Sequence, residues 1–133
     1  MPTGRRPVIM VVEDDHEMNH LERQLLELHG LDTFAAYTGT EALDLAQRRQ
    51  ADAVLLDIML PEMDGFETCR RLRLINDGKP PVVILSALDN EDCRRRGYEV
   101  GASAYFSKPF DPDELVNTLR SLIEQNGNPG RQA

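Results

Sequence analysis

Acidic side chains in this sequence stand directly after two short apolar runs. Glu13 and Asp14 follow the run Val8 to Val12. Asp57 follows the run Ala53 to Leu56. Carboxylates that crowd together repel one another by about 4 kcal/mol per pair at 4 Å and an effective dielectric near 20, so they need a cation among them. An all-oxygen, partly hydrated set of this kind suits Mg²⁺ (or Mn²⁺).

A hydroxyl and an amine follow two further apolar runs. Ser86 and Ala87 come after the fourth run of the chain, and Lys108 and Pro109 come shortly after the fifth. Taken one at a time, Ser86 could cap a helix, Lys108 could be a solvated charge, and Asp14 could cap the first helix. Taken together with the acids, they form the set that metal-assisted phosphoryl chemistry requires, because that chemistry depends on positioning and charge cancellation.

Five short apolar runs alternate with five amphipathic patterns along the chain. The expected strands are Val8 to Val12, Thr33 to Tyr37, Ala53 to Leu56, Val82 to Leu85 and Ala104 to Phe106. Strict alternation with short connections predicts an α/β fold with a five-stranded parallel sheet and helices on both faces. The flavodoxin-like order 2-1-3-4-5 fits, with the least apolar run, the second, at an edge. In that order the ends of strands one, three, four and five meet at one crevice.

Each expected helix begins with a capping side chain three residues before an acid, and most helices carry an apolar stripe. The expected capping residues are Asp14, Thr38, Asp64, Asp89 and Asp111. The residues expected on buried helix faces are Met18, Leu21, Leu25 and Leu28; Ala42, Leu43 and Ala46; Phe66, Cys69 and Leu72; Cys93, Gly97 and Val100; and Leu115, Leu119, Leu122 and Ile123. Gly30 is expected to end the first helix. These stripes are core faces rather than cofactor sites.

The composition points to a single acidic domain. A length of 133 residues suits one domain, expected at 7–125 between a disordered segment 1–6 and a flexible tail or linker stub 126–133. The 23 acids outnumber the 15 lysines and arginines, which leaves a net charge of −8 and argues against binding of nucleic acid by this domain. We expect no output domain after the last helix.

Nothing in the sequence predicts a membrane association. No apolar run has the length of a membrane span, and no charged-then-apolar leader opens the chain. The two cysteines, Cys69 and Cys93, lack metal-ligand spacing and indicate free thiols in a reducing compartment. We therefore expect a soluble cytoplasmic protein.

The chain resembles the receiver domains of two-component response regulators, of the chemotaxis-type single-domain form, over essentially residues 7 to 125. The motifs that carry the resemblance are Val-Val-Glu-Asp at 11 to 14, Leu-Asp-Ile-Met-Leu-Pro-Glu-Met-Asp-Gly at 56 to 65, Leu-Ser-Ala at 85 to 87, and Gly-Ala-Ser-Ala-Tyr-Phe-Ser-Lys-Pro-Phe at 101 to 110. The resemblance implies a phosphoprotein of bacterial-type signal transduction that catalyses only its own phosphorylation and dephosphorylation.

The resemblance also assigns roles to residues of this chain. It implies that Asp57 is the phosphoacceptor, and that Glu13, Asp14, Asp57 and the Met59 backbone carbonyl hold Mg²⁺. It further implies contacts to the phosphoryl oxygens, a switch and a structural proline. The residues with these implied roles are Ser86, the backbone N–H of Ala87 and Lys108 for the phosphoryl group; Ser86 and Tyr105 for the switch; and Pro109, whose bond to Lys108 is expected to be cis.

The same resemblance implies which partners the chain binds, and three other functions have to be weighed against it. A sensor histidine kinase or phosphotransfer protein would supply the phosphoryl group. A downstream protein or a second copy of the chain would bind the face made by the helix near 91–100, the strand 104–106 and the last helix. An aspartyl-phosphate hydrolase would need an acid two residues after Asp57, where Met59 stands. A flavodoxin-like cofactor site is disfavoured by the acids at 13–15, and a non-phosphorylated interaction module is the remaining alternative.

Overall fold

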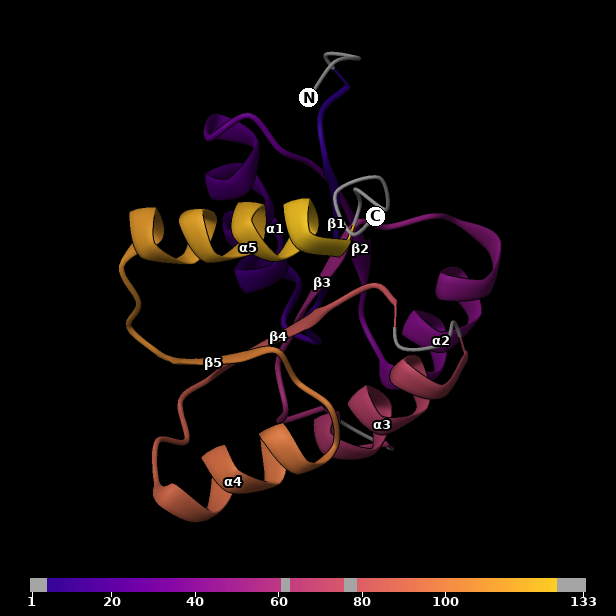
Figure 1. Cartoon of the computed structure of the whole chain (residues 1–133), viewed down its shortest axis with the longest axis vertical. Helices are drawn as coiled ribbons and strands as arrows, with labels where there is room; N and C mark the ends of the chain where they lie inside the picture. Colours follow the sequence, from indigo (N-terminus) through magenta and orange to yellow (C-terminus); the bar gives the residue numbers. More distant parts are fainter. Residues whose placement is uncertain (1–4, 61–62, 76–78, 127–133) are drawn as a thin grey trace.

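The computed structural model describes residues 5–60, 63–75 and 79–126 as five strands and five helices in alternation (Figure 1). The strands are β1 (Val8–Val12), β2 (Asp32–Ala36), β3 (Ala53–Leu56), β4 (Val82–Ser86) and β5 (Ala104–Ser107). The helices are α1 (His16–Leu28), α2 (Gly39–Arg48), α3 (Gly65–Ile75), α4 (Glu91–Glu99) and α5 (Pro112–Asn126). All five expected strands and all five helices are therefore present, with bounds that differ by one residue at most for the strands.

The five strands form one parallel sheet in the order β2-β1-β3-β4-β5, as predicted. The edge position of β2 is also confirmed, and it explains why that strand is the least apolar: one of its sides has no neighbouring strand. The central strand β3 is buried along its whole length. A continuous apolar run is what a strand covered on both faces requires.

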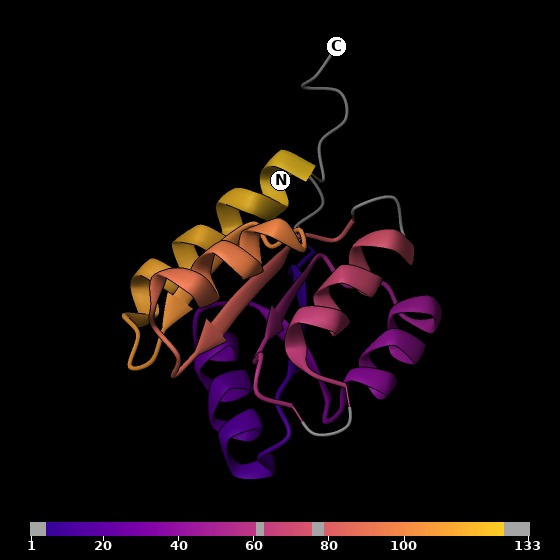
Figure 2. The ribbon, with the colours of Figure 1, turned by 90° about the horizontal axis from the view of Figure 1, so that it is seen from below.

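Alternate residues of β1, β3, β4 and β5 enter two separate hydrophobic cores, one on each face of the sheet. Met10 and Val54 belong to the core covered by α2, α3 and α4. Ile9 and Leu55 belong to the core covered by α1 and α5. Figures 1 and 2 show this layered arrangement, with α1 and α5 on one side of the sheet and α2 and α3 on the other. The sheet is thus held in place from both faces.

Two of the predicted helix caps are confirmed and two are shifted by one residue. Thr38 and Asp64 accept hydrogen bonds from the backbone N–H groups three residues later, at 3.0 and 2.9 Å. The cap of α1 is Asp15, whose carboxylate accepts from Met18 N, so the prediction of Asp14 was wrong. The cap of α4 is Asn90 rather than Asp89. In both cases the capping side chain belongs to the residue with extended backbone directly before the helix. Because Asp15 caps α1, the Asp14 carboxylate is not used as the cap.

Asp111 begins α5 with a different pattern from the one expected. Its carboxylate accepts from the backbone N–H of Asp113, at 3.0 Å, and its carbonyl accepts from Leu115 N. The helix itself starts at Pro112, as expected for a proline in the first turn. The end of α1 also agrees with the prediction, because Gly30 follows it in the left-handed region at φ +89°.

The buried face of α1 differs from the predicted one. The predicted stripe includes Leu21 and Leu28, yet these side chains are 57% and 87% exposed. The buried residues of the helix are instead Asn19, Glu22 and Leu26. The Asn19 amide donates to three backbone carbonyls at the ends of β1 and β2, and this turns the helix by one residue, or about 100°, from the apolar stripe. The hydrogen bonds decide the orientation.

The apolar stripes of the other helices face the core as predicted. Phe66, Cys69 and Leu72 of α3 are buried, as are Leu115 and Leu119 of α5. The remaining predicted core residues are buried or half-buried and pack against one of the two cores: Ala42, Leu43, Ala46, Cys93, Val100, Leu122 and Ile123. Gly97 of α4 is buried as well. Both cysteines are free thiols.

The ends of the chain lie largely outside the described residues. Of the expected disordered segment 1–6, the structure describes Arg5 and Arg6, which form ion pairs with Asp52 and Asp32. Of the expected tail 126–133, it describes the backbone of the first residue alone. Pro61 and Glu62 of the motif at 56 to 65 also lie outside the described part. Within 5–60, 63–75 and 79–126, no helix is both long enough and apolar enough to cross a lipid bilayer.

Gly65 lets the loop after β3 pass close to the strand end. A Cβ at this position would lie 2.1 Å from the Ile58 Cα and 2.8 Å from the Asp57 carbonyl oxygen. The Gly65 N–H donates to the Ile58 carbonyl at 2.9 Å. No larger residue fits without moving the backbone that carries Asp57.

We expect Gly65→Ala to lower the free energy of unfolding by about 1–3 kcal/mol, because the added methyl overlaps backbone atoms that cannot move aside. Urea denaturation measures this. Gly97→Ala is the matched comparison, since a Cβ there meets the ends of the Ile84 and Tyr105 side chains at 3.0 and 3.1 Å. A loss at Gly65 no larger than the loss at Gly97 would contradict the explanation.

Candidate functional site

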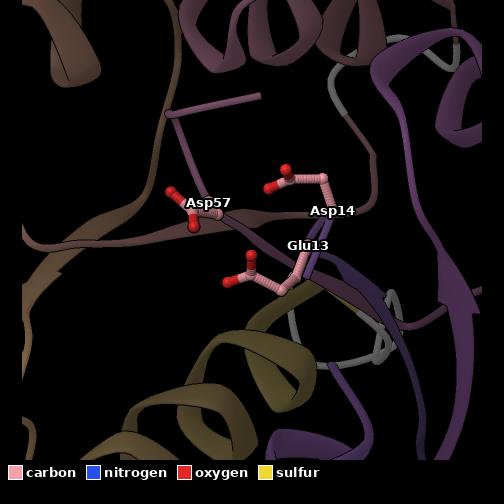
Figure 3. A group of neighbouring side chains, drawn as sticks. All are labelled: Glu13, Asp14 and Asp57. Atoms are coloured by element: carbon pink, nitrogen blue, oxygen red, sulfur yellow. The ribbon is translucent and has the colours of Figure 1, made fainter. Parts of the chain in front are cut away.

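Three carboxylates meet at the carboxyl edge of the sheet. Glu13 and Asp14 directly follow β1, and Asp57 directly follows β3, the strand beside it. One oxygen from each lies within 4.8 Å of the others, and Figure 3 shows the three side chains gathered around one space. The convergence predicted from the chain order is therefore confirmed for these three residues.

The strand ladder itself carries the acids into position. The backbone N–H of Asp57 donates to the Val12 carbonyl at 2.9 Å, and that of Glu13 donates to the Ala36 carbonyl at 3.1 Å. These bonds continue the sheet by one residue beyond the strands. Both side chains therefore start from backbone with little freedom to move apart.

Glu13 is a buried acid with an altered pKa. Its side chain is 4% exposed, and it accepts hydrogen bonds from Lys108 Nζ at 3.1 Å and from the Asp15 backbone N–H at 3.2 Å. Burial, and then the neighbouring Asp57 carboxylate, raise the pKa of Glu13 to about 8. A cation between the two carboxylates would favour the charged form of both.

The two carboxylate oxygens of Asp57 face two different donors. Oδ1 accepts from the Met59 backbone N–H at 2.9 Å, which orients the carboxylate. Oδ2 lies 3.4 Å from Lys108 Nζ. The side chain is 11% exposed, so the carboxylate is largely buried but is not sealed from solvent. The Met59 side chain is 57% exposed. The Met59 backbone carbonyl stays a predicted metal ligand.

Lys108 reaches the acids from the end of β5, the edge strand on the other side of β4 from β3. Its backbone N–H donates to the Ser86 carbonyl at 2.8 Å, which aligns the segment after β5 with β4. The Lys108–Pro109 peptide bond is cis, as the resemblance predicted. Burial lowers the pKa of Lys108, but the carboxylates of Asp57, Glu13 and Glu22 more than offset it, so the pKa is raised. Lys108 therefore carries its positive charge.

Ser86 and Tyr105 are linked through the residue between β4 and α4. Ser86 is fully buried, and its Oγ accepts a hydrogen bond from Leu88 N at 3.0 Å. The Tyr105 hydroxyl donates to the Leu88 carbonyl, and the tyrosine is 5% exposed. The Arg94 guanidinium lies over its ring, 5.0 Å from the centroid. The tyrosine is thus an inward-facing side chain tied to the segment that follows the serine, and Ala87 in that segment is exposed.

Two residues of the site are missing from the sequence prediction, and both lie on the buried face of α1. Asn19 donates to the Glu13 carbonyl at 3.1 Å and so holds the backbone of that acid. Glu22, one turn further along the helix, lies with Oε2 3.8 Å from Lys108 Nζ. The signal available in the sequence is their spacing: Asn19, Glu22 and Leu26 repeat at helical intervals, one residue out of step with the apolar stripe.

The donor set fits a small divalent cation. Glu13, Asp14 and Asp57 offer carboxylate oxygens of graded exposure, with Asp14 the most exposed. Asp15 has its carboxylate engaged as the α1 cap. Oxygen-only sites with one or two carboxylates and room for water suit Mg²⁺. Such an ion would neutralise the repulsion among the acids and would bind an anion brought to them.

A family model and several known proteins match this chain. The model of the response regulator receiver domain matches residues 9–120. The response regulator MprA of Mycobacterium sp. (strain KMS) is 39% identical over 117 residues, which make up 88% of this chain and 50% of MprA. MprA of Mycobacterium avium (strain 104) is 38% identical over 117 residues, or 88% of this chain and 51% of that protein. The chain thus spans about half the length of the curated relatives it matches.

Solved receiver structures match it over nearly their whole length. The receiver domain of the Francisella response regulator 1452 is 33% identical, with a TM-score of 0.84, over 91% of this chain and 99% of that one. The BeF₃-activated N-terminal receiver domain of Klebsiella pneumoniae RstA is 37% identical, with a TM-score of 0.81, over 87% and 97% of the two chains. Because the family model spans most of the chain and the sheet order agrees with it, the chain belongs to the response regulator receiver domain family.

Proposed function

We propose that this receiver accepts a phosphoryl group from a histidine kinase or phosphotransfer protein on Asp57, in a Mg²⁺-dependent reaction, and passes the signal on by a conformational switch. The observation that carries the proposal is the group of three carboxylates within 4.8 Å, with Lys108 3.4 Å from Asp57. An acid cluster with an ammonium beside it suits an incoming phosphoryl group, whose negative charge needs cations on more than one side.

In the proposed reaction, an Asp57 oxygen attacks the phosphorus of the donor's phosphohistidine. The oxygen–phosphorus bond forms as the nitrogen–phosphorus bond breaks, and the histidine nitrogen leaves with the electron pair. The Met59 N–H holds Oδ1, while Lys108 stands near Oδ2 to contact a phosphoryl oxygen. Glu13, Asp14, Asp57 and the Met59 carbonyl would hold Mg²⁺, which would supply charge neutralisation when bound. Ser86 and the Ala87 N–H complete the contacts to the phosphoryl group.

The proposed switch passes through Leu88. Ser86 would turn its hydroxyl towards the phosphoryl group and give up its hydrogen bond with Leu88 N. The Leu88 carbonyl also accepts from Tyr105, so a movement of this segment changes the support of the tyrosine ring. Phosphorylation would then shift the population between two arrangements of α4 and β5 rather than create a new one.

The surface of α4, β5 and α5 is the proposed site for a downstream protein or a second copy of the chain. Arg94, Arg95 and Arg96 are three consecutive basic residues of α4. Arg94 pairs with Asp89, and Arg95 pairs with Asp92 of its own helix. Arg96 lies over the ring of Phe66. The positive charge of this face is therefore partly neutralised within the domain, and the case for a partner depends on the switch.

Incubation with Mg²⁺ and acetyl phosphate should add one phosphoryl group to the protein, seen as a single mass increase by intact mass spectrometry. Asp57→Asn should abolish the increase, because the amide is not a nucleophile of this kind. Asp44→Asn, an exposed acid paired with Arg48, is the matched control and should phosphorylate like the wild type. Labelling of Asp57→Asn, or none in the wild type with Mg²⁺, would contradict the proposed function.

Replacing Ser86 with alanine should disconnect Tyr105 from phosphorylation. The chain contains three tyrosines, so fluorotyrosine labelling and ¹⁹F NMR can follow the Tyr105 signal before and after phosphorylation. We expect phosphorylation to shift that signal in the wild type. In Ser86→Ala the shift should be at most half as large, since the hydroxyl is the link to the phosphoryl group. Ser121→Ala on α5 serves as the control. An unchanged shift in Ser86→Ala would refute the switch through Leu88.

The phosphorylated form should lose its phosphate slowly for this family. Hydrolysis needs a water in line behind phosphorus. The resemblance to receiver domains implies that Met59 and Leu88 flank that approach, and both are apolar, with exposures of 57% and 39%. They shield the phosphoryl group and cannot orient water. Met59→Asn combined with Leu88→Glu should speed the decay of phospho-Asp57 roughly tenfold, because polar side chains can position the water. A radiolabel or mass time course measures it, and equal decay rates would exclude this explanation.

A further inference from the structure

Glu22 is a buried acid that the proposed reaction does not use. It lies on the inward face of α1 with a side chain 6% exposed. Among the buried side-chain nitrogen and oxygen atoms within the described ranges, its Oε2 is the one that has no hydrogen-bond partner. A buried carboxylate oxygen without a partner is costly, so its presence calls for a physical explanation.

The unpartnered oxygen faces the Lys108 ammonium. Oε2 is 3.8 Å from Nζ, just beyond hydrogen-bond distance, while Glu13 and Asp57 oxygens lie at 3.1 and 3.4 Å. An ammonium has three hydrogens to donate. Oxygens of three carboxylates lie within 3.8 Å of this ammonium, and a displacement of less than 1 Å would bring the Glu22 oxygen within hydrogen-bond distance.

We propose that Glu22 is a positioning residue of the acceptor site: its carboxylate is a competing counter-ion that draws the Lys108 ammonium towards α1 and weakens its hold on a phosphoryl group at Asp57. This inference rests on the proposed function. Lys108 is the protein's own cation at the acceptor, so any acid that shares it reduces what remains for an incoming anion. The Glu22 charge also repels that anion directly, and both effects act in the same direction.

The charged groups around Glu22 make its effect dependent on pH. Burial raises its pKa to about 7, Lys108 lowers it, and Asp57 and Asp15 raise it further. Above pH 7 the ionised carboxylate competes for the ammonium, whereas below pH 7 the protonated form does not. The groups that face the pair come from the ends of β1 and β3, the start of α1 and the segment after β5.

The test measures how tightly the acceptor site holds an anion. Beryllofluoride is the probe, added with Mg²⁺ to the wild type and to Glu22→Gln, and the bound fraction is followed by ¹⁹F NMR. At pH 8.5 we expect Glu22→Gln to bind about tenfold more tightly, the effect of one like charge removed at close range. At pH 5.5 the two proteins should bind equally. Glu13, Asp15, Asp57 and Lys108 are unchanged in the variant, so the only residue that differs between the two proteins is Glu22.

Two further variants control the experiment. Glu17→Gln removes one negative charge from the exposed side of the same helix and should leave the affinity unchanged. Glu22→Leu removes the charge and all hydrogen bonding, and it should also bind more tightly, which covers a failure of the amide variant to fold. Equal or weaker binding by the Glu22 variants at pH 8.5, or a ratio that does not change with pH, would overturn the inference alone. A wild type that binds no beryllofluoride would overturn the proposed function with it.

Discussion

Like-charge repulsion at one edge of the sheet is the constraint on which this structure depends. Glu13, Asp14 and Asp57 bring three carboxylates within 4.8 Å of one another, and Lys108 supplies the ammonium beside them. Water would normally separate such charges, and the rest of the fold opposes that separation. The site therefore favours a cation, and its all-oxygen donor set fits a metal ion.

The hydrophobic cores on the two faces of the sheet hold the three acids together against this repulsion. Alternate residues of the strands are buried against α1 and α5 on one side and against α2, α3 and α4 on the other, which keeps the strand register from slipping. The backbone hydrogen bonds from Glu13, Asp57 and Lys108 then extend the ladder into the functional residues. Apolar burial far from the site thus determines the distances within it.

The repeating pattern of this chain made most of the fold and much of the site predictable. Each apolar run is long enough for one strand only, and the acids, the hydroxyl and the amine of the site stand at or shortly after the ends of such runs. The sheet order therefore brings Glu13, Asp57 and Lys108 together. Caps were less predictable. Asp14 and Asp15 are chemically alike neighbours, and which of them begins α1 depends on backbone dihedral angles that the residue types do not distinguish.

The sequence by itself therefore determined the fold class, the strand order and the residues at the carboxyl edge, because those depend on local periodicity and chain connectivity. The tertiary structure alone decided which side of α1 faces the sheet. Met18 and Leu21 continue an apolar stripe, yet Asn19 faces inward because its amide finds three backbone carbonyls at the strand ends. That rotation carries Glu22 to Lys108, a contact between residues far apart in the chain that no local pattern predicts.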